Sequence, residues 1–179
     1  MVVGAVFAAV TPAPDARAAV AEGLTEMDIP GRLTPVENWH ITLRYLGAVD
    51  QLTYERFLGG LGEVGERGPF PLGLGSVGAF PNPRRATVVW VGVDRGADAL
   101  HDLAAICEEA AQGAGLAPED RPFRPHLTLS RVRPPADVTA LVGQPVSARW
   151  LVDRVIVYRT VSGRGGVRYE PLESVPLGV

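Results

Sequence analysis

The pattern of apolar and polar positions along the chain predicts a series of short strands. A Val-rich apolar run over residues 2–10 is typical of a buried strand, and residues 39–46 (WHITLRYL) are rich in β-branched and aromatic side chains. The sequence SGRGG at 162–166 is a hairpin signal between the last two strands. About seven strands are expected, the other five at 70–80, 86–93, 126–132, 153–160 and 167–175.

Apolar positions at helical spacing predict three or four helices between these strands. One helix follows Asp15, a candidate N-cap, and a second opens at Asp50. The clearest covers residues 97–112, and a short one is expected near 136–142. Because helices and strands do not alternate strictly and no linker divides the chain, we expect one α+β domain with mainly antiparallel sheet.

The amino-acid composition excludes several kinds of reactive site. The 179 residues carry 20 acidic and 17 basic side chains and are 46% apolar, as expected of a folded globular chain. All basic residues are Arg, which excludes a Lys nucleophile or a P-loop Lys, and the single Cys107 excludes a disulfide framework. No run approaches the ~18 apolar residues of a membrane span, and the N-terminus lacks signal-peptide features. We therefore expect a cytoplasmic protein, and because no exposed apolar stripe stands out we expect a monomer.

Two of the three histidines begin nearly the same tetrapeptide. His40 opens HITL and His126 opens HLTL, 86 residues later, an offset close to half the chain. Alternate side chains of a strand share a face, so His40 should lie beside Thr42 and His126 beside Thr128. The spacing predicts two similar lobes, each of which presents an imidazole and a hydroxyl from a rigid strand.

Two opposed His–Thr pairs suit phosphoester cleavage. Imidazole has an ordinary pKa near 6.5, so both of its protonation states are accessible at neutral pH. A neutral His can take a proton from water while a protonated His gives one to the departing oxygen. The two Thr hydroxyls can donate hydrogen bonds to the phosphate oxygens, and this scheme needs no metal.

Four arginines cluster near the second tetrapeptide. They lie within thirteen residues that contain no acid, which favours a compact phosphate site over a broad nucleic-acid-binding face: Arg121, Arg124, Arg131 and Arg133. Strict alternation would turn Arg131 away from His126. A role for Arg131 in the site therefore requires the strand to end or bulge near Ser130.

The remaining candidates divide between site and core. Phe80, next to a Pro-rich turn, and Trp90 could each stack on a nucleobase, although an aromatic residue in an apolar strand is more typical of a core. Tyr45 shares the strand face of core residues and is expected in the core, as is Cys107. His101 lies off the apolar stripe of its helix and is expected in solvent.

Residues 38–47 (NWHITLRYLG) and 123–131 (FRPHLTLSR) resemble the two signature motifs of the 2H phosphoesterases. More specifically, they resemble the bacterial RNA 2′,3′-cyclic phosphodiesterases, historically called 2′-5′ RNA ligases. That family often has an Arg just before the first strand's Phe, whereas here residues 4–6 (GAV) precede Phe7. The likeness extends along the chain to residues 6–9, 78–81, 89–93 and 169–172.

The resemblance implies a bilobal fold over residues 1–179. Two mainly antiparallel sheets with outer helices would be related by a pseudo-two-fold axis around a central cleft. By the family's pattern His40 is the proton donor and His126 the acceptor that activates water. Thr42 and Thr128 hold the phosphate, and Arg131 matches the Arg that closes the second motif. Family members leave a terminal 2′-phosphate, so the 3′-oxygen departs.

The expected activity is hydrolysis of 2′,3′-cyclic phosphate ends of RNA or small nucleotides, without metal or cofactor. Phe80 is a candidate base-stacking residue. The same acid–base pair could also join RNA ends through a 2′-5′ bond. A non-catalytic RNA-end or nucleotide-binding module is a further alternative. So is a structural protein in which each of the two histidines is buried and bonded to its Thr.

Overall fold

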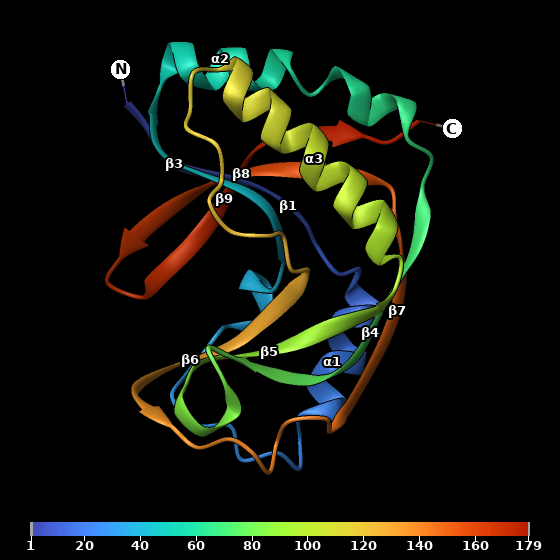
Figure 1. Ribbon diagram of the computed structural model, residues 1–179, viewed down its shortest axis with the longest axis vertical. Helices are drawn as coiled ribbons and strands as arrows, with labels where there is room; N and C mark the ends of the chain where they lie inside the picture. The colour runs from blue at the N-terminus through green and yellow to red at the C-terminus, as the bar shows by residue number, and fades with distance from the viewer. Residues whose placement is uncertain (1, 179) are drawn as a thin grey trace.

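Nine strands form two sheets within residues 2–178, which are the residues that this computed structural model describes, and every strand pairing is antiparallel. The first sheet has the order β3-β1-β8-β9 and the second the order β2-β6-β5-β4-β7 (Figure 1). The first sheet comprises β3 (Ile41–Asp50), β1 (Val2–Val10), β8 (Arg154–Gly163) and β9 (Gly166–Pro176). The second comprises β2 (Arg32–Leu33), β6 (His126–Ala136), β5 (Ala86–Arg95), β4 (Phe70–Phe80) and β7 (Pro145–Val152).

The two sheets repeat one arrangement. With the two-residue β2 set aside, the second sheet reads β6-β5-β4-β7, and it matches β3-β1-β8-β9 position by position. Strand β3 begins one residue after His40, and strand β6 begins at His126. These two strands take corresponding places in the two sheets. The predicted α+β fold with two mainly antiparallel sheets is therefore confirmed.

The helices cross between the lobes. Helix α1 (Pro14–Gly23) follows β1 of the first sheet but packs on β7 of the second. Helix α3 (Ala97–Gly113) follows β5 of the second sheet but packs on β3 of the first, beside α2 (Gln51–Gly59), as Figure 1 shows. Because each lobe's outer helix continues from the other lobe's sheet, the two lobes cannot separate without unpacking both helices.

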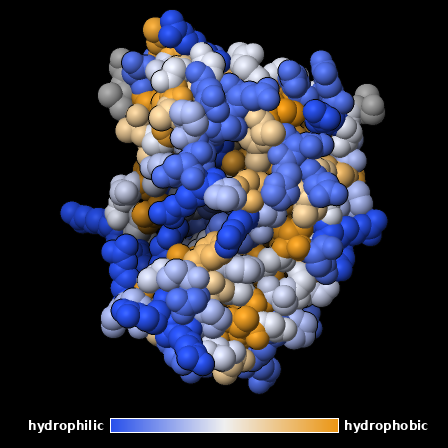
Figure 2. All heavy atoms as spheres, in the orientation of Figure 1, coloured by the Kyte–Doolittle hydropathy of each residue, from blue (hydrophilic) through white to orange (hydrophobic). Residues whose placement is uncertain are grey.

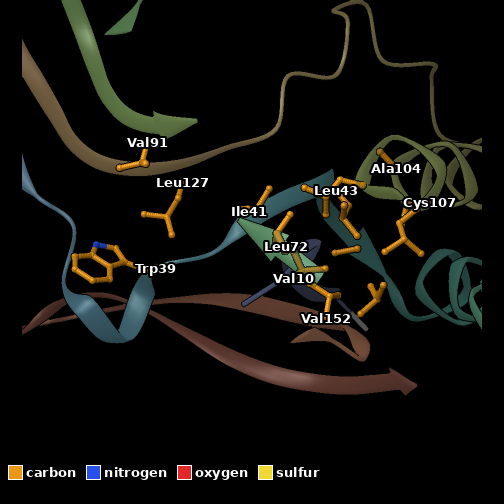
Figure 3. Packing of buried hydrophobic residues seen from close by; sticks show 14 of the residues in the cluster. Val10, Trp39, Ile41, Leu43, Leu72, Val91, Ala104, Cys107, Leu127 and Val152 are labelled. Atoms are coloured by element: carbon orange, nitrogen blue, oxygen red, sulfur yellow. The ribbon is translucent and has the colours of Figure 1, made fainter. Parts of the chain in front are cut away.

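A single cluster of buried apolar side chains joins the two lobes. Ile41 of β3 and Leu127 of β6, which alternate with the pocket-facing residues of their strands, are both fully buried in it (Figure 3). Cys107 of α3 also lies there, as predicted. Full burial of a side chain of this size contributes roughly 1.5–3 kcal/mol, so the apolar alternate positions anchor the two motif strands firmly.

The structure corrects several expectations. The helix expected at 136–142 is absent: Ala136 ends β6 and residues 139–143 form turns, where the Asp137 carboxylate accepts hydrogen bonds from the N–H (2.9 Å) and hydroxyl (2.6 Å) of Thr139. Asp15 is not the N-cap of α1; the helix starts at Pro14, whose fixed φ suits the first helical position. The described chain has two strands more than the seven predicted, β2 and β7.

No helix among residues 2–178 is both long enough and apolar enough to cross a membrane.

Candidate active site

A pocket of about 280 Å³ lies between the two sheets and receives residues from both. Figure 2 shows this face of the molecule hollowed across its middle, with hydrophilic residues around the hollow. The pocket holds both His–Thr pairs and Arg131, the five residues to which the resemblance assigns a role in the reaction. Its lining residues are Phe7, Thr34, Asn38, His40, Thr42, Tyr45, His126, Thr128, Arg131, Thr160 and Tyr169.

His40 lies directly before β3, after the short 3₁₀ helix η1 (Val36–Asn38). Its Nδ1 is 2.8 Å from the backbone carbonyl oxygen of Asn38. Because a carbonyl can only accept, Nδ1 must carry a hydrogen and donate it. The other ring nitrogen, Nε2, is 2.9 Å from Oγ1 of Thr42. This nitrogen is therefore the one that can gain or lose a proton in the pocket.

His126, the first residue of β6, is held in the same way. Its Nδ1 is 2.6 Å from the backbone carbonyl oxygen of Arg124, two residues earlier, just as Asn38 stands two residues before His40. Nδ1 is again the donor, which leaves Nε2 for chemistry. The two lobes thus present the same imidazole nitrogen from equivalent backbone positions.

An aromatic side chain packs edge-on against each imidazole. Tyr169 meets His40 with ring centroids 5.1 Å apart, and Phe80 meets His126 with centroids 5.0 Å apart, both at 87°. Phe80 is not among the residues that line the pocket, because it packs between His126 and Trp90. The structure places half-buried Phe80 against the His126 ring, and its role in stacking on a base stays a prediction.

Burial lowers the pKa of both histidines below their usual value near 6.5. The carbonyl bonds at Nδ1 oppose this shift, whereas the positive charge of Arg131 adds to it for both rings. A charge on His126 also lowers the pKa of His40, so the rings are close enough to influence each other. The free pocket favours neutral imidazoles, and a bound phosphate would draw a proton back to one of them.

A β-bulge brings Arg131 into the pocket. Trp90 of β5 pairs with Thr128, but the preceding Val89 pairs with Ser130, so Leu129 is an extra residue in β6. Leu129 and Ser130 are consecutively buried, and Arg131 then emerges on the same side as Thr128. The bulge that the sequence analysis required near Ser130 is confirmed.

The first lobe has the same bulge. Ala9 of β1 pairs with Thr42 and Ala8 pairs with Arg44, which makes Leu43 the extra residue of β3. Tyr45 consequently emerges into the pocket and is 53% exposed. The expectation that Tyr45 belongs to the core is wrong, because strict alternation fails at this bulge.

Comparison with known proteins agrees with this geometry. Residues 11–164 match the family model of the 2′-5′ RNA ligase superfamily. The chain belongs to the 2′-5′ RNA ligase superfamily. A superfamily protein from Aeropyrum pernix named RNA 2′,3′-cyclic phosphodiesterase is 35% identical over 127 residues, 68% of each chain. One of the same name from Escherichia coli is 29% identical over 143 residues, 80% of this chain and 78% of the relative.

Solved structures share nearly the whole architecture of the chain. E. coli LigT complexed with 3′-AMP superposes with a TM-score of 0.85 at 26% identity, over 97% of this chain and 98% of LigT. A crystal structure described as a phosphoesterase gives a TM-score of 0.84 at 26% identity, over 98% and 99% of the two chains. The bilobal arrangement around the pocket is thus shared with these solved structures.

The pocket contains residues that the sequence analysis did not assign to the site. Asn38 is buried, its carbonyl orients His40, and its side-chain Nδ2 donates to the carbonyl of Val167 in β9, 2.8 Å away. Tyr169 packs on His40. The signal for Tyr45 was present in the sequence, since Tyr45 and Arg131 are separated by the same 86 residues as the two histidines.

The other expected groups lie outside the pocket lining. Of the four clustered arginines, Arg131 lines the pocket, while Arg121, Arg124 and Arg133 are exposed elsewhere and Arg124 contributes its backbone carbonyl to the site. His101 is exposed on α3, as predicted. Residues 2–178 hold no group of three or more His, Cys, Asp or Glu side chains arranged to bind a metal ion.

Proposed function

We propose that this protein hydrolyses 2′,3′-cyclic phosphate ends of RNA or nucleotides to 2′-phosphate ends, by metal-independent acid–base catalysis between His40 and His126. The observation that carries the proposal is the matched pair of imidazoles in one pocket, each with Nδ1 fixed as a donor and Nε2 left for proton transfer. The names of the relatives and the 3′-AMP complex of LigT support the same substrate class.

The reaction assigns one role to each imidazole. Neutral His126 takes a proton at Nε2 from a water molecule whose oxygen attacks phosphorus, and protonated His40 gives its Nε2 proton to the departing 3′-oxygen. The P–O3′ bond breaks, which leaves a 2′-phosphate and a free 3′-hydroxyl. His40 ends neutral and His126 ends protonated, and proton exchange with solvent resets both.

Arg131, Thr42 and Thr128 are the donors that surround the reacting phosphate. Charge builds on the non-bridging oxygens as water attacks, and guanidinium and hydroxyl groups can donate to those oxygens. The substrate also supplies the charge that the acid requires. A phosphate beside His40 raises the pKa that burial and Arg131 lower in the free pocket, so substrate binding itself favours the protonated acid.

The proposal is tested by His40→Ala and His126→Ala, with His101→Ala as the matched control on the surface of α3. Each is assayed in EDTA on a short RNA that ends in a 2′,3′-cyclic phosphate, and the product is resolved by phosphorus NMR. We expect each pocket variant to lose at least ~100-fold in kcat, the control to retain activity, and the product to be the 2′-phosphate. Retained activity in either pocket variant, a 3′-phosphate product or loss of wild-type activity in EDTA would overturn it.

The same experiment separates the alternatives. An RNA with a 5′-hydroxyl end, added at rising concentration, would yield 2′-5′ joined product if ligation dominates. A pure binding module would bind the cyclic phosphate without any product. A monomeric state and a cytoplasmic location stay predictions from sequence.

A further inference from the structure

Two arginines stand directly opposite each other beside the pocket. Arg32 of β2 is the register partner of Arg131 of β6 in an antiparallel pairing. Residues directly opposite in such a pair share one face, with Cβ atoms about 4.5–5.5 Å apart, and like charges placed there destabilise the pair. Since Arg131 lines the pocket, Arg32 lies on the same face, one strand further out.

No acidic side chain within residues 2–178 neutralises this pair. Arg32 and Arg131 are both exposed, and neither takes part in an ion pair or a side-chain hydrogen bond there. The arginines that do form ion pairs in this part of the chain are Arg44, Arg67, Arg149, Arg154 and Arg159. Two adjacent unpaired guanidinium groups repel each other, which destabilises the folded protein. An anion that contacts each of them would offset that repulsion.

Arg32 lies where the two lobes meet. A Cβ atom at Gly166 would be 2.9 Å from Nη2 of Arg32, so this guanidinium rests against the β8–β9 hairpin of the other sheet. The same hairpin is tied to the pocket by the bond from Asn38 to Val167. Its own Arg164 is exposed, with no ion pair in the described chain, so the positive surface continues outward from the pocket past Arg32.

We propose that Arg32 binds the 5′-phosphate of the nucleotide that carries the cyclic phosphate, which makes RNA ends better substrates than mononucleotides without that group. This inference rests on the proposed function. The 5′-phosphate is one ribose away from the cyclic phosphate, and Arg32 is one strand away from Arg131. One nucleotide with two phosphates therefore matches two neighbouring guanidinium groups. In RNA that 5′-phosphate is the diester to the preceding nucleotide.

Three substrates test the inference: adenosine 2′,3′-cyclic phosphate, its 5′-phosphorylated form, and the dinucleotide ApA that ends in a 2′,3′-cyclic phosphate. For the wild type we expect higher kcat/KM for the last two, with the advantage falling as salt rises. Arg32→Gln should lower kcat/KM for those two by ~10-fold, as expected for loss of one charge-assisted hydrogen bond, and leave the first within about twofold. Arg56→Gln, an exposed position on α2, is the control and should change none.

Several outcomes would overturn the role of Arg32. One is that Arg32→Gln lowers kcat/KM equally on all three substrates, or on none. Another is a higher wild-type kcat/KM for ApA alone, which would indicate a nucleoside contact. The last is a higher wild-type kcat/KM for the 5′-phosphorylated mononucleotide alone, which would exclude an RNA diester. A binding assay keeps the test independent of turnover. Arg32→Gln should weaken the binding of adenosine 2′,5′-bisphosphate but not the binding of adenosine 2′-monophosphate. Equal weakening for the two ligands would contradict the inference. If the wild type opens none of the substrates, the proposed function fails while this assay still decides on Arg32.

Discussion

Tyr45 and Arg131 occupy equivalent positions in the two lobes. Each follows its lobe's histidine by five residues, each comes after a bulge at the equivalent Leu, and each lines the pocket. The lobe of His40 therefore has an aromatic ring at the position where the lobe of His126 has a cation. The backbone is duplicated, and the difference between these two side chains distinguishes the two halves of the site.

We expect Tyr45→Ala to weaken substrate binding more than turnover. The 3′-oxygen that His40 would protonate belongs to the ribose, so the nucleoside lies toward the first sheet, where the Tyr45 ring is 53% exposed. Stacking of a base on an aromatic ring is worth about 1–3 kcal/mol, so KM should rise at least ~5-fold while kcat stays within about twofold. Steady-state kinetics check this, with Tyr45→Phe as the control that keeps the ring. An unchanged KM in Tyr45→Ala would contradict it.

Arg131→Gln should lower kcat/KM by ~100-fold, the usual loss when one donor to a developing oxyanion is removed. It should also raise the pKa of His40 and of His126. Burial is the main reason that both values are low, and the positive charge of Arg131 adds to it, so removing the charge moves both upward. Proton NMR titration of the ring C–H signals measures the shift. Unchanged histidine titrations in Arg131→Gln would show that the guanidinium does not act on the rings.

The free energy of unfolding should fall as the pH is lowered from 7.5 to 5.5. In the folded protein burial holds the pKa of His40 and His126 below 6.5, so the unfolded chain binds more protons in this range. The stability due to the neutral rings is present above pH 6.5 and is lost below it. Urea unfolding at several pH values measures the slope. His126→Asn should flatten it, whereas a substitution at exposed His101 should not; an equally steep slope in His126→Asn would refute the linkage.

The sequence was sufficient to predict most helices and strands and to single out the two histidines that meet in the pocket. The run at 70–80 and the N-cap at Asp50, whose carboxylate accepts from the N–H of Thr53 at 2.8 Å, were predicted correctly. β7 (Pro145–Val152) was missed although its residues alternate strictly between exposed and buried. Each of its buried residues is separated from the next by an exposed one, and Pro145 at its start is a residue more typical of a loop.

The bulges explain the error about Tyr45. Period-two alternation predicts faces correctly only while the register is continuous, and an extra residue at Leu43 reverses it for the residues that follow, up to the next register shift at Leu46. The same reversal at Leu129 was anticipated, because Arg131 needed it to reach the site. Applying the 86-residue repeat to both strands would have moved Tyr45 into the pocket as well. The contact of Phe80 with His126 could not be predicted, because it depends on how β4 packs in three dimensions.

Arg44 should prove important for stability and, through the loop before β6, for activity. It is 9% exposed, its Nε lies 2.5 Å from Oε2 of Glu108, and its Nη2 donates to the carbonyl of Ala117 at 2.7 Å. The bond to Ala117 ties the loop 114–125, which delivers the carbonyl that orients His126, to β3 of the other lobe. Glu108 of α3 holds the same loop, because its carboxylate accepts from the N–H of Glu119 at 2.9 Å.

We expect Arg44→Met to reduce the free energy of unfolding by about 2 kcal/mol, because it leaves the Glu108 carboxylate without its cation and the Ala117 carbonyl without a donor. Arg154→Gln removes an exposed, solvent-screened pair with Asp153 and should reduce the free energy of unfolding far less. Urea unfolding at pH 7.5 compares the two variants.

The loop's connection to the site is measured by kcat under conditions where both variants are folded. Arg44→Met should lower kcat because the backbone that holds Nδ1 of His126 is no longer anchored, and Arg154→Gln should leave it unchanged. Equal stability of the two variants, or an unchanged kcat in Arg44→Met, would show that the loop is held by other contacts.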